Sequence, residues 1–80
     1  MHYVYILQSI DFPEQLYVGQ TTDLDDRLQA HNSGRVVHTT KYKPWKIVTY
    51  LAFSNKSSAL DFEKYLKSSS GRAFKYKRLL

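Results

Sequence analysis

Two short stretches rich in β-branched and aromatic residues, separated by a polar loop, most constrain the fold of this chain. Residues 3–7 and 16–19 have the composition of strands. Residues 9–15 contain Asp11 and Pro13, which favour a loop. The pattern therefore predicts an antiparallel hairpin at the amino end.

Capping residues place the first helix, and an apolar stretch places the third strand. Thr22 and Asp23 offer capping oxygens for a helix that we expect to run to about His31 and to stop at residues 32–34. A basic, polar connection over residues 35–44 leads to a third strand over residues 45–53. It is the longest and most apolar of the three strands.

The rest of the chain predicts further helices. We expect Ser57 and Ser58 to cap a helix that runs to about Lys67, Gly71 to break it, and residues 72–79 to add a short basic helix. The predicted fold class is α+β: a small three-stranded antiparallel sheet flanked by helices, in the order β-β-α-β-α-α. Eighty residues suffice for one domain, so residues 1–80 are expected to form a single domain.

Composition excludes several classes of function. The chain has no cysteine, which rules out a disulfide framework, a thiolate nucleophile and a cysteine-based zinc site. No apolar run approaches the roughly 20 residues that a membrane helix requires, and the amino end lacks the pattern of a signal peptide. A soluble protein of the cytoplasm, without a membrane partner, is the expectation; the oligomeric state stays open.

Charge is distributed unevenly along the chain. Residues 1–34 hold five acids and one base, whereas residues 35–80 hold eleven bases and two acids. A basic half of this kind favours a polyanion partner, because neutralising phosphates releases counterions. A merely solvated basic surface is the alternative. The candidate phosphate contacts are Arg35, Lys41, Lys43, Lys46, Lys64, Lys67, Arg72, Lys75, Lys77 and Arg78.

Three charged or polar side chains fall on helix faces that should be apolar. At about 100° per residue, Arg27 and His31 lie inside or beside the inward stripe of the first helix. Glu63 lies at the edge of the inward stripe of the second helix. Burying a charge costs several kcal/mol unless it is paired or used. Two explanations fit this pattern about equally well. One is an Arg27–Glu63 ion pair with His31 beside it, and the other is a functional site.

The predicted hairpin favours a functional site over a purely structural ion pair. If the two strands pair residues whose numbers sum to an even value, Tyr5 and Tyr17 emerge on one face. Gly19, two residues further on, leaves that face open for a phosphate or a close backbone approach.

These residues resemble a known family. Tyr3-Val4-Tyr5 and Tyr17-Val18-Gly19 resemble the two motifs of GIY-YIG nucleases, and the stretches 16–32 and 58–64 are similar to theirs. The resemblance is strongest with the small stand-alone branch of predicted endonucleases. Tyr3 replaces the glycine of the first motif. Gln20 stands where some repair relatives have lysine, so help from that cation is missing.

The resemblance implies a divalent-metal endonuclease that hydrolyses nucleic-acid phosphodiesters, DNA in the first instance. It assigns Glu63 to Mg²⁺ (or Mn²⁺), Arg27 and His31 to the scissile phosphate, and Tyr5 or Tyr17 to activation of the attacking water. A phenol is a poor base at its usual pKa of about 10, so a neighbouring cation must lower it. His31 is expected to supply a donor or a proton near neutral pH. His38, Thr39 and Thr40 could line the groove, although a plain surface loop is favoured there.

Two other functions compete with the nuclease. One is a non-catalytic nucleic-acid-binding module on the same fold. The other is a small interaction protein in which Arg27 and Glu63 form only a buried ion pair.

Overall fold

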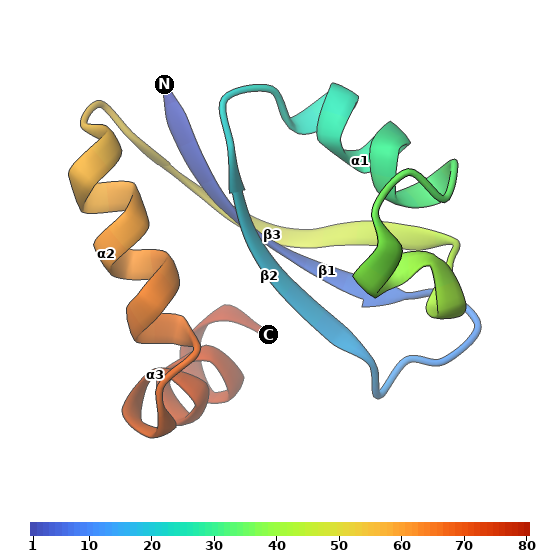
Figure 1. Ribbon diagram of the computed structural model, residues 1–80. Coiled ribbons are helices and arrows are strands. Elements are labelled where there is room, and N and C mark those ends of the chain that lie inside the picture. Colours follow the sequence, from blue (N-terminus) through green and yellow to red (C-terminus); the bar gives the residue numbers. More distant parts are fainter.

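A three-stranded antiparallel sheet forms the centre of the computed structural model, which describes residues 1–80 (Figure 1). Strand β1, His2–Ser9, lies in the middle, between β2, Leu16–Thr21, and β3, Trp45–Phe53. The remaining segments are helical and follow in the predicted order. The α+β class and the order of elements are therefore confirmed, and the third strand has the predicted bounds.

The register of the hairpin places both motif tyrosines on one face of the sheet. Tyr5 pairs with Gly19 and Leu7 with Tyr17, so paired numbers sum to an even value. Side chains alternate between faces along a strand, so Tyr5 and Tyr17 emerge on the same side. The condition stated for the two phenols is confirmed.

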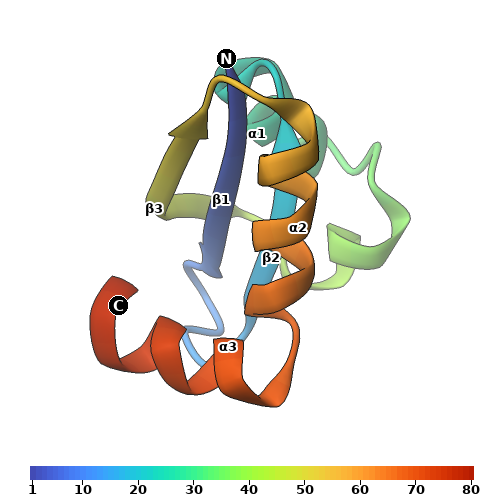
Figure 2. The same cartoon turned by 90° about the vertical axis from the view of Figure 1, so that its left-hand side faces the viewer.

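An apolar layer covers the opposite face. Helix α2, Lys56–Leu66, packs Ala59 and Leu66 against Val4, Ile6 and Val18 of the sheet. Figure 2 shows α2 lying along the sheet and the last helical segments crossing below it. The predicted cap at Ser57 and Ser58 is wrong: the side chain of Asn55 accepts the hydrogen bond from the Ser58 N–H, so the helix begins one turn earlier.

Gly71 lies inside a helix and does not break one. Ser68 caps α3, Ser69–Phe74, by accepting from the Gly71 N–H, and a π-helical turn, Lys75–Leu79, continues the chain. A Cβ on Gly71 would collide with the backbone carbonyl of Tyr65. The glycine is thus needed for the close approach of α3 to the end of α2, a tertiary contact that local propensity does not reveal.

The face with the tyrosines is covered by α1, Leu24–Asn32, and by a 3₁₀ helix, Val37–Tyr42. Asp23 caps α1 through the Asp26 N–H, as predicted, and Leu24 and Leu28 pack towards Tyr5, Leu7 and Trp45. Trp45 is buried in the core on this face of the sheet. None of the helices is long and apolar enough to cross a membrane.

Candidate active site at the edge of the sheet

Four of the five predicted catalytic side chains lie together between α1 and the sheet. Tyr5 Oη lies 2.9 Å from His31 Nε2, and Arg27 Nε donates to Tyr5 Oη at 3.4 Å. The ring of Tyr17 lies 5.0 Å from that of His31 and 6.4 Å from that of Tyr5, measured between centroids. Strand β1, strand β2 and helix α1 each contribute to this polar cluster, which we define as Tyr5, Tyr17, Arg27 and His31.

Thr39 extends the polar cluster into the core. His31 Nδ1 lies 2.7 Å from Thr39 Oγ1, and that hydroxyl donates to the carbonyl of Val36 at 3.3 Å. Thr39 is buried, so the expectation of a plain surface loop is wrong at this position. Residues 35–44 show no hydrophobic periodicity, so the burial of Thr39 could not be predicted from the local pattern.

The partners set the direction of the whole chain of hydrogen bonds. The Thr39 hydroxyl donates its proton to the Val36 carbonyl, so its oxygen accepts from His31 Nδ1–H. His31 Nε2 is then an acceptor, and it receives the Tyr5 hydroxyl proton, while Tyr5 Oη accepts from Arg27. Each of the buried side-chain atoms of Tyr5, His31 and Thr39 in these hydrogen bonds thus has a partner, as burial of polar groups requires.

Burial keeps His31 neutral. The imidazole is fully buried, and this desolvation, with the positive charge of Arg27 as a second cause, lowers the pKa of His31 from 6.5 to about 4. The expectation that His31 supplies a proton near neutral pH is corrected accordingly. Both of its nitrogens are engaged, so its observed role is to hold Tyr5 and Thr39 in place.

Tyr5 is also a poor base in this setting. Desolvation raises the pKa of its phenol above the usual 10.0, and the hydrogen bond and charge of Arg27 counter this only in part. Glu63 adds a small upward contribution to the same pKa, so its carboxylate lies within electrostatic reach of Tyr5. The lowered pKa that a general base requires is not found at Tyr5.

Arg27 lies between the two phenols. The pKa of Arg27 is raised further above its high usual value, chiefly by the hydrogen bond to Tyr5 and in addition by Tyr17. Its side chain is half-buried and has no carboxylate partner. A guanidinium that is oriented by neighbouring phenols and not paired with a carboxylate is suited to bind a phosphate.

Gly19 accommodates the Tyr5 ring. A Cβ at this position would collide with the hydroxyl end of Tyr5, the strand neighbour opposite. The glycine therefore makes room for a side chain, the ring of the motif tyrosine, whereas the sequence predicted an open face for a phosphate or a close backbone approach.

Asn32 anchors the carboxyl end of α1 to the sheet. Its side-chain amide accepts from the Trp45 N–H at 2.6 Å and donates to the Trp45 carbonyl at 3.1 Å. The indole of Trp45 in turn donates to the carbonyl of Thr39 at 2.8 Å. These bonds fix the helix that carries Arg27 and His31, a positioning role that the sequence did not reveal.

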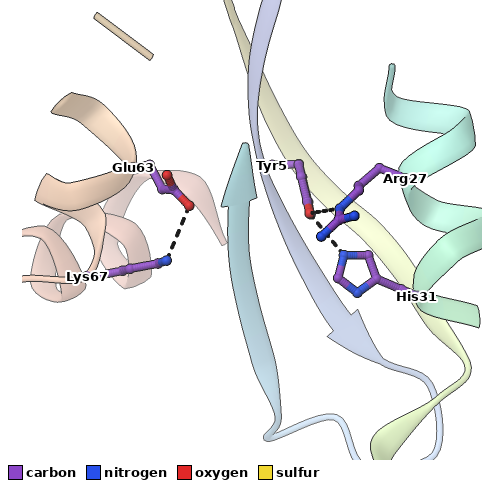
Figure 3. A network of polar contacts seen from close by, with 5 residues as sticks. All are labelled: Tyr5, Arg27, His31, Glu63 and Lys67. Atoms are coloured by element: carbon purple, nitrogen blue, oxygen red, sulfur yellow. Dashed lines mark hydrogen bonds and ion pairs between the residues drawn. The ribbon is translucent and has the colours of Figure 1, made fainter. Parts of the chain in front are cut away.

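Glu63 does not join the polar cluster. Figure 3 shows Glu63 on α2 and Lys67 just beyond the end of this helix, on the other side of β2 from Tyr5, Arg27 and His31. The Glu63 carboxylate accepts from Lys67 Nζ at 3.2 Å, and its side chain is 21% exposed. The alternative Arg27–Glu63 ion pair is absent, so the buried-pair explanation of these two residues is wrong.

A metal site would rest on one carboxylate. No group of three or more histidine or acidic side chains is arranged to hold a metal ion. A single partly exposed carboxylate is still compatible with Mg²⁺, which retains several of its waters and takes one or two protein carboxylates.

The predicted phosphate contacts are in different environments. Most of these basic side chains are exposed, whereas Lys67 is paired with Glu63 and Lys75 is only 8% exposed. Lys41 and Lys75 lie 5.5 and 5.3 Å from the rings of Tyr42 and Tyr76, respectively.

The family model of the GIY-YIG catalytic domain matches residues 1–77. The chain therefore belongs to the GIY-YIG family, in the small stand-alone branch of the UPF0213 proteins.

Individual relatives support this placement. A UPF0213 protein of Lactococcus lactis subsp. cremoris is 40% identical over 77 residues, which cover 95% of this chain and 76% of the relative. A UPF0213 protein of Haloquadratum walsbyi is 40% identical over 68 residues, 84% of this chain and 74% of the relative. The solution structure of the UPF0213 protein BH0048 from Bacillus halodurans is 36% identical, with a TM-score of 0.56, and the match covers 95% of this chain and 80% of that one.

Proposed function

We propose that residues 1–80 form a single nuclease domain that hydrolyses phosphodiester bonds of nucleic acid, DNA in the first instance, with a divalent metal ion. The observation that carries the proposal is the position of Arg27. Its guanidinium contacts Tyr5, lies beside Tyr17 and has no carboxylate partner. A pure binding module has no need to hold an arginine so firmly between two phenols.

Each residue of the polar cluster then has a distinct role. Arg27 binds the scissile phosphate and bears part of the charge that develops in the transition state. Tyr5, His31 and Thr39 hold Arg27 through the directed chain of hydrogen bonds. Tyr17 is the better candidate for the base that takes a proton from the attacking water, because it is half-exposed whereas Tyr5 is only 2% exposed.

Glu63 would hold the metal ion, Mg²⁺ or Mn²⁺, with water and substrate oxygens in the remaining positions. Such an ion supplies Lewis-acid stabilisation of the phosphate and lowers the pKa of a bound water. The ammonium of Lys67 forms an ion pair with the Glu63 carboxylate in the structure. In this proposal its ammonium leaves Glu63 when the ion binds.

A cleavage assay tests the function. The protein is incubated with single-stranded, duplex and branched DNA, with Mg²⁺ or Mn²⁺ or with a chelator. We expect metal-dependent cutting that is lost in Glu63→Gln, with folding intact because Glu63 is partly exposed. Asp61→Asn is the matched control, since Asp61 is an exposed carboxylate on the same helix. Equal rates with and without metal, or equal losses in both variants, would remove Glu63 from the mechanism.

A non-catalytic nucleic-acid-binding module is the second candidate. The observation that favours it is the engaged carboxylate: Glu63 is paired with Lys67 and has no second acidic or histidine ligand beside it. DNA binding without cutting of any substrate, and no change in metal binding on Glu63→Gln, would select this alternative.

A further inference from the structure

A hollow opens between the outer strand β2 and the helices α2 and α3, on the other side of β2 from Arg27. It has a volume of about 310 Å³ and is lined by residues 16–18 of β2 and by Leu66, Lys67, Arg72 and Lys75. One water occupies about 30 Å³ in the liquid, so the hollow has room for a hydrated anion. No acidic residue lines it.

Lys75 is the unusual member of this group. The residue is 8% exposed, and its ammonium has no carboxylate partner; the centroid of the Tyr76 ring lies 5.3 Å away. Burial, and in second place the charge of Arg72, lower the pKa of Lys75 below its usual 10.5. A largely buried lysine beside another cation and without a counter-ion is stabilised when an anion binds beside it.

The position of the hollow relates it to the candidate active site. Tyr17 lines the hollow and also lies against His31 of the polar cluster, so one residue of the edge strand borders both. Lys67 lines the hollow and also holds Glu63. The hollow therefore shares Tyr17 and Lys67 with the site at which Arg27 and Glu63 are proposed to act.

We propose that this hollow binds a backbone phosphate of the nucleic acid, one that neighbours the phosphate being cleaved. Lys75 and Arg72 supply the charge, and Lys67 joins them when it leaves Glu63. The inference rests on the proposed function for its ligand, but not on catalysis, because a phosphate site is also needed for binding without cutting.

The test compares Lys75→Met with Lys56→Met. Lys56→Met removes the same charge as Lys75→Met, and Lys56 is exposed at the start of α2 and does not line the hollow, so it is a matched control. Binding of a short single-stranded oligonucleotide is measured over a range of salt concentrations without metal. We expect Lys75→Met to weaken binding about tenfold or more and to reduce the salt dependence by about one phosphate contact, and Lys56→Met to change binding less than threefold.

Stability separates a binding role from a structural one. Lys75 has no carboxylate partner to lose, so replacing it by an apolar side chain of similar shape is expected to leave the melting temperature unchanged or to raise it. If Lys75→Met fails to fold, Arg72→Gln serves instead, because Arg72 is exposed and lines the same hollow. Equal losses of affinity in the hollow variant and in Lys56→Met would overturn the proposal.

Inorganic phosphate distinguishes the source of the anion. Titration followed by the amide signals of Arg72 and Lys75 is expected to show weak, saturable binding that Lys75→Met abolishes. Phosphate binding with no loss of oligonucleotide affinity in Lys75→Met would indicate a site for free phosphate and would overturn the proposal. If Lys75→Met loses oligonucleotide affinity and the native protein cuts no substrate, the phosphate site is supported and the proposed nuclease function is not.

Discussion

The two faces of the sheet differ in what they bury. The face under α2 and α3 is apolar, with Val4, Ile6 and Val18 packed against Ala59 and Leu66. The face under α1 has an apolar cluster as well, but it also carries a chain of hydrogen bonds from Arg27 to Val36 that passes through three buried side chains. The apolar packing on both faces offsets the cost of burying these polar groups.

A core truncation should show the largest effect on the apolar face. Leu66→Ala removes a fully buried side chain from that core and is expected to lower the free energy of unfolding by about 2–5 kcal/mol. Chemical denaturation measures the loss. Leu60→Ala, an exposed leucine on the same helix, should cost well under 1 kcal/mol. Equal costs for both variants would mean that α2 does not pack as described.

A conservative change at Arg27 should leave the fold intact and impair activity. Arg27→Lys keeps the charge but loses the planar fork between the phenols, so we expect the cleavage rate to fall by about 10²–10³ while the melting temperature changes little. Arg35→Lys, at an exposed position after the same helix, should lower the rate only a few-fold. A large loss of stability in Arg27→Lys would indicate a structural role.

The neutral, buried His31 predicts a dependence of stability on pH. In the unfolded chain the imidazole takes up a proton near pH 6.5, whereas in the folded protein it does so only near pH 4. Stability is therefore fully present above pH 6.5 and is lost as the pH falls towards 4, by about 3 kcal/mol in total from this group. Denaturation at a series of pH values measures the effect, and His38→Gln, at an exposed histidine, should leave it unchanged.

The smallest effect is expected at Lys67. Its ammonium competes with a metal ion for Glu63, so Lys67→Met should raise the affinity for Mn²⁺ a few-fold, in keeping with the modest strength of partly exposed ion pairs. Calorimetric titration without nucleic acid measures this, and Lys56→Met is the control. Unchanged or weaker Mn²⁺ binding in Lys67→Met would count against Glu63 as the ligand.

Local patterns predicted most of the fold. An apolar stretch predicted the third strand with its bounds, and the Asp23 cap predicted the start of α1, because both depend on neighbours in the sequence. Gly71 and Thr39 were misread because their environments come from distant residues, Tyr65 in one case and His31 in the other. Tertiary contacts of this kind leave no periodic signal.

The candidate site was predictable only in part. The helical wheel indicated that Arg27, His31 and Glu63 point inward, and the register brought the first two to Tyr5. A wheel does not show which face of the sheet a helix covers, so the separation of Glu63 from the polar cluster by β2 could not be foreseen. Whether the residues on the two sides of this strand act on one phosphate is the central question.

A double-mutant cycle of the cleavage rate tests this most directly. Single-turnover rates are compared for the native chain, Arg27→Lys, Glu63→Gln and the double variant. If both residues act on one phosphate, their effects are coupled, and the double variant should be little slower than the slower single variant. Effects that multiply independently would show that the two sides of β2 work separately, and would contradict a shared active site.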